Sequence, residues 1–182
     1  MNILVVAASR HGATQEIADS IGRTLRAEGL TASVLPIADA GDLTGYDAFV
    51  VGSAVYMGHW LDPARTFVAN GIETLSCRPT WLFSSGPIGD PARPHASDAV
   101  DVDEVMSTTH AKAHRLFAGK LDKSKLGFGE RAIMLAFGAS EGDYRDWDEV
   151  ATWARDISED VRSDSTSSAA AVGRGEERSL RS

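Results

Sequence analysis

The segment Ile3–Thr14 reads ILVVAASRHGAT and joins an apolar run to a short polar loop. The apolar run, Ile3–Ala8, contains no polar residue, which is typical of a strand that is buried on both faces. Residues 14–28 then carry apolar side chains four positions apart, as one buried face of a helix requires. These side chains are Ile17, Ile21 and Leu25. Gly29 stands at the stop position, so the segment predicts a strand, a loop and a helix in succession.

Outward from this segment, apolar runs and helical patterns alternate along the chain. Further buried strands are predicted at Thr31–Ile37, Asp47–Gly52, Thr80–Ser85 and Arg115–Gly119. Strands that are buried on both faces and separated by helices form parallel sheets. We therefore predict an α/β fold with a doubly wound, five-stranded parallel sheet of order 2-1-3-4-5 and helices on both faces.

Two further helices are predicted from their first residues. One begins at Asp62, which we expect to cap it, with Pro63 in its first turn and an end at Gly71. Its buried face is formed by Phe67 and Val68. The last helix begins at Asp146, with Glu149 completing a capping pair. Its buried face is formed by Val150, Ala154, Ile157 and Val161.

Length and composition limit the class of protein. The chain has 182 residues, which predicts one domain, and 43% of them are hydrophobic, enough for a core. Residues 164–182 are rich in Ser, Ala, Gly and Arg without an apolar period, so we predict a folded domain over residues 1–163 and a disordered tail after it. The net charge of −8 argues against nucleic acid as a partner. The single cysteine, Cys77, cannot form an internal disulfide, and the N-terminus lacks the features of a signal peptide, so we expect a cytoplasmic protein.

The polar loop between the first strand and the first helix is suited to a phosphate group. Backbone N–H groups at a helix start are unpaired and carry partial positive charge, and the loop adds two hydroxyls and a glycine. Neither a dinucleotide-binding fingerprint nor a Walker loop is present, so a monophosphate fits best. The alternative is that the loop only turns the chain and caps the helix. The candidate residues are Ser9, Arg10, His11, Gly12, Ala13 and Thr14, with Arg10 pointing either to solvent or to a partner.

Two more loops should open at the same edge of the sheet, because ligands of open parallel sheets sit at the carboxyl ends of the strands. The loop after the third strand combines an aromatic ring, a thioether and a glycine, which suits a flat ring that is stacked and partly enclosed. Its candidate residues are Ala54, Val55, Tyr56, Met57, Gly58 and His59, with Tyr56 as the stacking residue. The loop after the fourth strand would wall the other side of the ring. Its candidate residues are Ser85, Gly86, Pro87, Ile88 and Gly89.

No catalytic residue can be assigned from the pattern, and His59 is the one candidate. It is either a proton donor near the bound ring or a polar residue before the helix. Trp60 is interpreted as a packing residue at the helix start. No metal site is predicted.

These motifs together resemble the flavodoxin-like superfamily over residues 1–160. The resemblance rests on Ser9-x-x-Gly12-x-Thr14, on the block Tyr46–Ser53 and on Tyr56-x-Gly58-His59. Within the superfamily the chain is similar to the menaquinone-dependent protoporphyrinogen oxidase branch, through Gly58-His59, Leu116–Gly119 and the start of the last helix at Asp146–Val150. The resemblance implies non-covalent binding of flavin mononucleotide (FMN), electron transfer to a quinone or another redox partner, and a porphyrinogen substrate.

Residues 126–138 are unusually apolar for a connecting stretch, with only Glu130 and Arg131 breaking the pattern. One interpretation is a surface that docks a quinone, contacts a membrane peripherally, or pairs with a second copy in a homodimer. The other is a helix that packs on the sheet. We favour packing or self-association over membrane contact.

Three functions are compatible with a fold of this order. The first is an FMN-dependent oxidoreductase that acts on porphyrinogens with a quinone acceptor. The second is a flavodoxin-type electron carrier without its own small-molecule substrate; strong acidity around the flavin would favour it, because carriers dock on basic partners. The predicted flavin loops are mixed in charge, which favours the enzyme. The third is a phosphoacceptor receiver domain, which is excluded because the acidic positions it needs are Ala8-Ser9 and Gly52-Ser53 here.

Overall fold

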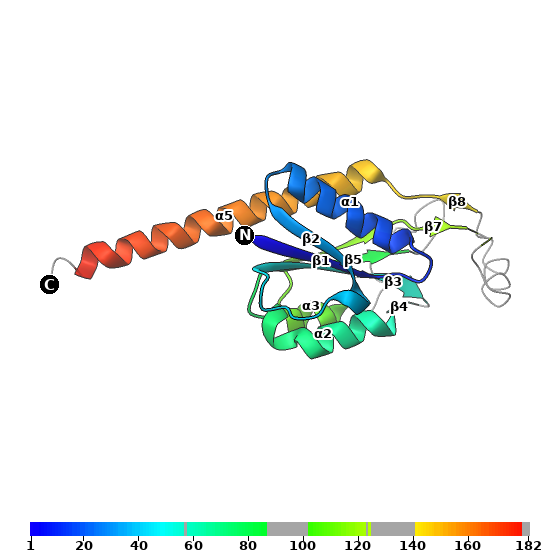
Figure 1. The fold of residues 1–182 in the computed structure, drawn as a ribbon, viewed down its shortest axis with the longest axis horizontal. Helices are drawn as coiled ribbons and strands as arrows, with labels where there is room; N and C mark the ends of the chain where they lie inside the picture. The colour runs from blue at the N-terminus through cyan, green and yellow to red at the C-terminus, as the bar shows by residue number, and fades with distance from the viewer. Residues whose placement is uncertain (57, 87–101, 123, 125–140, 180–182) are drawn as a thin grey trace.

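The computed structural model describes residues 1–56, 58–86, 102–122, 124 and 141–179, with side chains described up to Asp164. Its main sheet confirms the predicted fold class (Figure 1). The parallel strands are β1 (Asn2–Ala8), β2 (Thr31–Pro36), β3 (Ala48–Tyr56), β5 (Thr80–Ser85) and β6 (Ala113–Phe117). They are arranged in the order β2-β1-β3-β5-β6, which is the predicted order 2-1-3-4-5. A short strand, β4 (His59–Trp60), pairs antiparallel with the end of β3.

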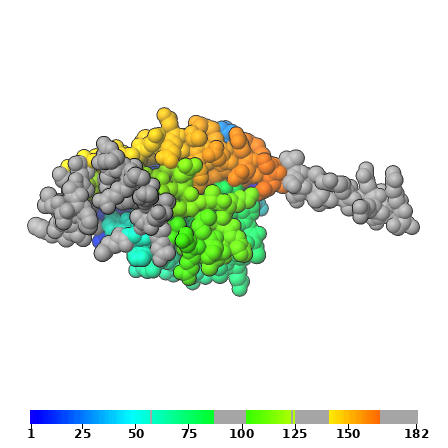
Figure 2. All heavy atoms as spheres, turned by 180° about the vertical axis from the view of Figure 1, so that it is seen from behind, coloured from blue at the N-terminus to red at the C-terminus, as the bar shows by residue number. Residues whose placement is uncertain are grey.

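Helices cover both faces of this sheet, as Figure 1 shows. The helix α1 (Ala13–Ala27) and the first part of α5 (Trp147–Ser179) pack on one face. On the opposite face lie α2 (Asp62–Leu75) and α3 (Asp103–Thr109). The view from behind in Figure 2 shows α5 along one side of the body and α2 on the other, with the segment that contains α3 and β6 between them. Each face of the sheet therefore has its own hydrophobic cluster.

The predicted faces of α1 and α5 are buried, whereas in α2 Val68 is buried and Phe67 is only partly buried. Ile17, Ile21 and Leu25 of α1 are fully buried, and the four predicted face residues of α5 are at most 1% exposed. Gly29 has a φ of +84°, as a helix stop requires. At Gly52 in the middle of β3, a Cβ would lie 2.0 Å from the ring of Phe83, so only glycine fits beside that ring.

The start and the end of α2 differ from the sequence prediction. Leu61, not Asp62, is the N-cap residue, and the Asp62 carboxylate pairs with Arg65 instead of capping the helix. The helix also continues past Gly71 to Leu75. A glycine inside a helix costs only about 1 kcal/mol, and the fully buried Leu75 favours the extra turn. Gly71 has a packing role, because a Cβ there would lie 2.9 Å from Leu43.

Several short elements were not predicted. They are the 3-10 helix η1 (Ile37–Asp39), β4, α3 and the antiparallel pair β7 (Lys120–Leu121) and β8 (Gly142–Asp143). The last parallel strand begins at Ala113, two positions before the predicted Arg115. The apolar stretch 126–138 lies outside the described residues. No helix in the described part of the chain is long and apolar enough to cross a membrane.

The C-terminal helix is longer than the sequence pattern suggests. The sequence predicts a disordered tail after residue 163, whereas α5 continues as one helix to Ser179 and projects beyond the body in Figure 1. The domain boundary at residue 163 stays a prediction.

Candidate functional site

The carboxyl ends of three neighbouring strands lie at one edge of the sheet. In the parallel register, Ala8 of β1 is paired with Ser53 of β3, and Ala54 of β3 is paired with Ser85 of β5. The loops that follow β1, β3 and β5 therefore start side by side. The sequence analysis assigned a phosphate to the first loop and a flat ring to the other two, and the sheet brings the starts of all three together.

The first loop leads into a helix start that has no side-chain cap. Gly12 is the N-cap residue of α1, with a φ of +90°, and a Cβ built there would meet nothing within 4 Å. The first intrahelical bond runs from the Glu16 N–H to the Gly12 carbonyl at 3.0 Å. The amides of residues 13–15 precede that bond and lack intrahelical acceptors. Open amides at a helix start fit a phosphate group.

The two hydroxyls of this loop have different surroundings. The Ser9 Oγ accepts a hydrogen bond from the Gly12 N–H at 3.0 Å, so it closes the loop on itself while its own proton remains available to an anion. Thr14 lies in the first turn of α1 and is only 2% exposed. Both predicted hydroxyls are thus held at the amide end of α1.

Arg10 connects the phosphate loop to the end of β3. Its guanidinium carbon lies 5.2 Å from the centre of the Tyr56 ring, which is within cation–π range. Arg10 was predicted to point either to solvent or to a partner. Its side chain is exposed, and it also lies over Tyr56, the residue predicted to stack on the flat ring. A positive charge therefore lies over Tyr56, the last residue of β3.

The chain after β3 is fixed by hydrogen bonds from the sheet. The Ser53 Oγ accepts from the Leu61 N–H at 3.0 Å and donates to the Ala54 carbonyl at 2.8 Å. Gly58 has a φ of +84°, so it supplies the turn that was predicted for it. The exposed His59 lies on β4, and Trp60 is 3% exposed, which confirms that Trp60 is a packing residue.

A buried polar chain beneath this loop was not predicted. The Trp60 Nε1–H donates to the Ser84 Oγ at 2.8 Å, and the same oxygen lies 2.8 Å from the Nε2 of His114. Burial lowers the pKa of His114 below its ordinary value of 6.5, and the nearby Asp103 opposes that shift. A neutral His114 can accept the Ser84 proton, so the chain ties β4 to β5 and β6.

The third loop is described only at its start. Ser85 is buried, and Gly86 has a φ of +110° and donates its N–H to the Phe117 carbonyl at 3.0 Å. The remaining predicted ring contacts, Met57, Pro87, Ile88 and Gly89, lie outside the described residues.

Arg145, a buried cation beside the first turn of α1, was not predicted from the sequence. Its side chain is 2% exposed, and it donates to both Asp143 carboxylate oxygens, at 2.7 and 2.6 Å. It also donates to the Ala13 carbonyl at 3.1 Å and contacts Glu16 at 2.8 Å. The hydrogen bond from Arg145 lowers the pKa of Asp143. No sequence motif marks Arg145. Asp143 is two positions away, but Ala13 and Glu16, which place Arg145 beside the first turn of α1, are more than a hundred positions away along the chain.

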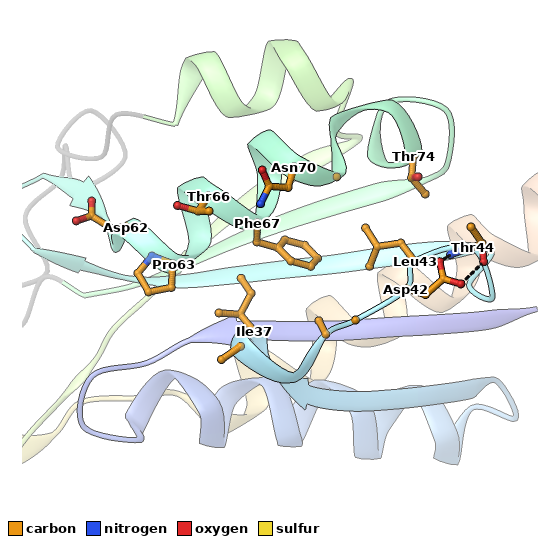
Figure 3. Close-up of a pocket in the computed structure, with 14 residues that line it drawn as sticks. Ile37, Asp42, Leu43, Thr44, Asp62, Pro63, Thr66, Phe67, Asn70 and Thr74 are labelled. Atoms are coloured by element: carbon orange, nitrogen blue, oxygen red, sulfur yellow. Dashed lines mark hydrogen bonds between the residues drawn. The ribbon is translucent and has the colours of Figure 1, made fainter.

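A surface groove lies elsewhere, on the α2 face. It has a volume of about 750 Å³ and runs between α2 and the segment from η1 to Thr44 (Figure 3). Phe67 and Leu43 line its middle, and Asp42 is hydrogen-bonded to Thr44 at one end. None of the residues predicted to hold the phosphate or the ring lines this groove.

Comparison with known proteins points to one family. A family model described as Flavodoxin domain matches residues 4–148. The protoporphyrinogen IX dehydrogenase (quinone) of Escherichia coli K12 is 23% identical over 171 residues, covering 86% of this chain and 94% of that protein.

Solved structures show the same fold. A flavodoxin from the domain Archaea superimposes with a TM-score of 0.57 at 19% identity, covering 89% of this chain and 99% of that one. Oxidised flavodoxin 2 from Bacillus cereus gives a TM-score of 0.58 at 21% identity, covering 88% and 99%.

Proposed function

Because the chain belongs to the flavodoxin domain family, we propose that it is an FMN-dependent oxidoreductase that oxidises a porphyrinogen and passes the electrons to a quinone. The family establishes the coarser statement, namely an electron-transfer flavoprotein that binds FMN. When bound, FMN supplies redox chemistry that no amino-acid side chain offers. The substrate and the acceptor are the parts that we propose.

In this proposal the open start of α1 holds the phosphate of FMN. The free amides of residues 13–15 and the hydroxyls of Ser9 and Thr14 would donate hydrogen bonds to the phosphate oxygens. Tyr56 would stack on the isoalloxazine ring, and Gly58 and Gly86 would bring backbone close to it.

The positive charge of Arg10 near Tyr56 is the observation that favours an enzyme over an electron carrier. Arg10 lies 5.2 Å from the centre of the Tyr56 ring, where a carrier that docks on basic partners would present carboxylates. If Tyr56 stacks on the isoalloxazine ring, the exposed Arg10 cation would lie near that ring, where it would favour negative charge and therefore acceptance of electrons from a substrate. The match over 94% of a quinone-dependent dehydrogenase supports the same function.

The reaction balances without any further reactant. Each turnover removes two electrons and two protons from the substrate and delivers them to one quinone, which leaves as the quinol. Full oxidation of a porphyrinogen to a porphyrin removes six electrons and six protons, so it takes three turnovers and three quinones. The protein's own contribution is to bind and orient the ring and to keep a positive charge beside it. His59, exposed on β4 next to the ring loop, is our candidate for the group that moves a proton.

The alternative is a flavodoxin-type carrier that exchanges electrons only with partner proteins. It is favoured by the fold, which is shared with solved flavodoxins. The two functions differ in whether the purified protein alone turns over a small molecule.

The test combines a spectrum with an anaerobic assay. Purified protein reconstituted with FMN is given protoporphyrinogen IX and a menaquinone analogue, and the appearance of porphyrin fluorescence is followed. Quinone-dependent porphyrin formation supports the enzyme. Flavin bands without turnover favour the carrier, and failure to bind FMN would refute both. The His59→Gln variant tests the proton-transfer role, with Asp62→Asn, a neighbouring exposed residue, as the matched control.

A further inference from the structure

Arg145 is the one buried guanidinium that contacts the first turn of α1 in the part of the chain that the structure describes. Its side chain is 2% exposed, although it comes directly after β8 and before α5, a region without catalytic assignment. An arginine is rarely buried unless its N–H groups are paired, and here they are shared between Asp143, Ala13 and Glu16. Its guanidinium also lies 4.4 Å from the centre of the Trp147 ring.

Two of these partners belong to the turn that presents the open amides. The Ala13 carbonyl, which accepts from Arg145 at 3.1 Å, belongs to the first residue of α1. Glu16, 2.8 Å from Arg145, is the first residue whose N–H enters the helical ladder. Any displacement of Arg145 therefore moves or frees the turn on which the phosphate is proposed to bind.

The charges of this cluster explain why an arginine is needed. A glutamate in the first turn is attracted to the open amides and repels a phosphate that binds them. Arg145 holds the Glu16 carboxylate at the flank of the helix and offsets one of two neighbouring negative charges, those of Glu16 and Asp143. Without Arg145, the negative charges of Glu16 and Asp143 would be left uncompensated beside the first turn of α1.

We infer that Arg145 is a positioning residue for the phosphate of FMN, acting through Ala13 and Glu16 rather than by touching the cofactor. This inference rests on the proposed placement of the phosphate at α1. It assigns to Asp143 the task of orienting Arg145 through the two-oxygen contact, and to Glu16 the role of a carboxylate that Arg145 keeps away from the anion.

The test compares two flavins that differ only in the phosphate. Dissociation constants of FMN and of riboflavin are measured for the apoprotein by quenching of flavin fluorescence, at low and high salt. For Arg145→Gln we expect FMN affinity to fall at least roughly tenfold, riboflavin affinity to change by less than about threefold, and the loss to shrink as salt increases. Arg145→Lys keeps the positive charge but loses the planar guanidinium that contacts two oxygens at once. Its FMN affinity should therefore lie between those of the parent protein and of Arg145→Gln.

A second variant separates charge from simple structural support. Adding Glu16→Gln to Arg145→Gln should restore part of the FMN affinity. The Glu16 carboxylate, which loses its partner in Arg145→Gln, is then no longer present to repel the phosphate. Glu16 is half exposed, so Glu16→Gln alone should fold. It should bind FMN at least as tightly as the parent protein. This variant therefore tests the inference even if Arg145→Gln does not fold.

Different outcomes refute different claims. If the parent protein binds FMN no better than riboflavin, the proposed phosphate site is wrong. If the parent prefers FMN but Arg145→Gln weakens both flavins equally, or Glu16→Gln restores nothing, Arg145 only supports the fold and the inference is wrong.

Discussion

The N–H groups at the start of α5 are capped by a side chain, whereas those at the start of α1 are not. Before α5, one carboxylate oxygen of Asp146 accepts hydrogen bonds from the N–H groups of Asp148 and Glu149, at 2.9 and 3.0 Å. At α1, Gly12 has no side chain to offer, and the first turn has no side-chain cap. A helix that brings its own carboxylate needs no external anion, whereas the start of α1 is left open to one. The contrast separates a helix start that is capped by its own side chain from the one at which we propose that a ligand binds.

The largest expected effect comes from removing both hydroxyls at the open start. In the variant Ser9→Ala with Thr14→Ala, each lost hydrogen bond to the phosphate should cost about 1.5–3 kcal/mol of FMN binding free energy. Fluorescence titration of the apoprotein measures this loss. Riboflavin is the matched control, because it lacks the phosphate and its affinity should change much less. Full retention of FMN would show that the phosphate does not bind at α1.

The next effect comes from giving α1 the kind of cap that α5 has. In Gly12→Asp, the new carboxylate would take the open amides and repel the phosphate, so we expect FMN affinity to fall by roughly a hundredfold. Gly12→Asn is the matched control, because asparagine has the same shape and tolerates positive φ better than most residues, without the charge. If the aspartate and asparagine variants bind FMN equally well, the open amides are not the anion site.

The sequence contained the information for both helix starts, but not for what surrounds them. Local patterns identified β1, the glycine at the start of α1, the cap at Asp146 and the buried face of α5, because each depends on residues within one or two turns. They failed at Asp62, where an aspartate in the expected position pairs with Arg65 instead of capping α2. Residue type alone cannot tell whether a carboxylate reaches an amide or a neighbouring guanidinium.

Long-range contacts explain the rest of what was missed. Arg145 contacts Ala13, and His114 contacts Ser84, through pairings that only the folded sheet brings about. The placement of Arg10 over Tyr56 likewise depends on β1 and β3 being neighbours. The three loops could be assigned to one edge from the strand order, but their side-chain contacts could not.

A smaller effect is expected from removing the cap that α5 already has. Asp146→Ala leaves two amides without their acceptor and should lower the free energy of unfolding by about 1 kcal/mol. Asp146→Asn keeps an acceptor oxygen and should lie within a few tenths of a kcal/mol of the parent. Urea denaturation measures both variants. The ratio of FMN to riboflavin affinity should not change. If Asp146→Ala selectively lowered FMN affinity, the start of α5 would also affect phosphate binding, and the distinction between it and the start of α1 would be wrong.

The smallest expected effect is a pH dependence carried by Asp143, the residue paired with Arg145. The hydrogen bond from Arg145 lowers the pKa of Asp143 below its ordinary value of 3.8, against the opposing effect of burial. The unfolded chain therefore binds the proton more readily than the folded chain does. The stabilising contribution is complete above pH 3.8 and is lost as the pH falls through the folded value.

Urea unfolding of the parent and of Asp143→Asn at a series of acidic pH values measures this contribution. The parent should lose stability more steeply than Asp143→Asn in that range, and Arg145→Gln should show the shallower slope of Asp143→Asn, because the same pair is broken in both. If Asp143→Asn keeps the slope of the parent, the Asp143–Arg145 pair does not contribute to stability. In that case the two carboxylates would have different roles. Asp146 would stabilise its helix directly, whereas Asp143 would serve only to hold Arg145 beside the open start of α1.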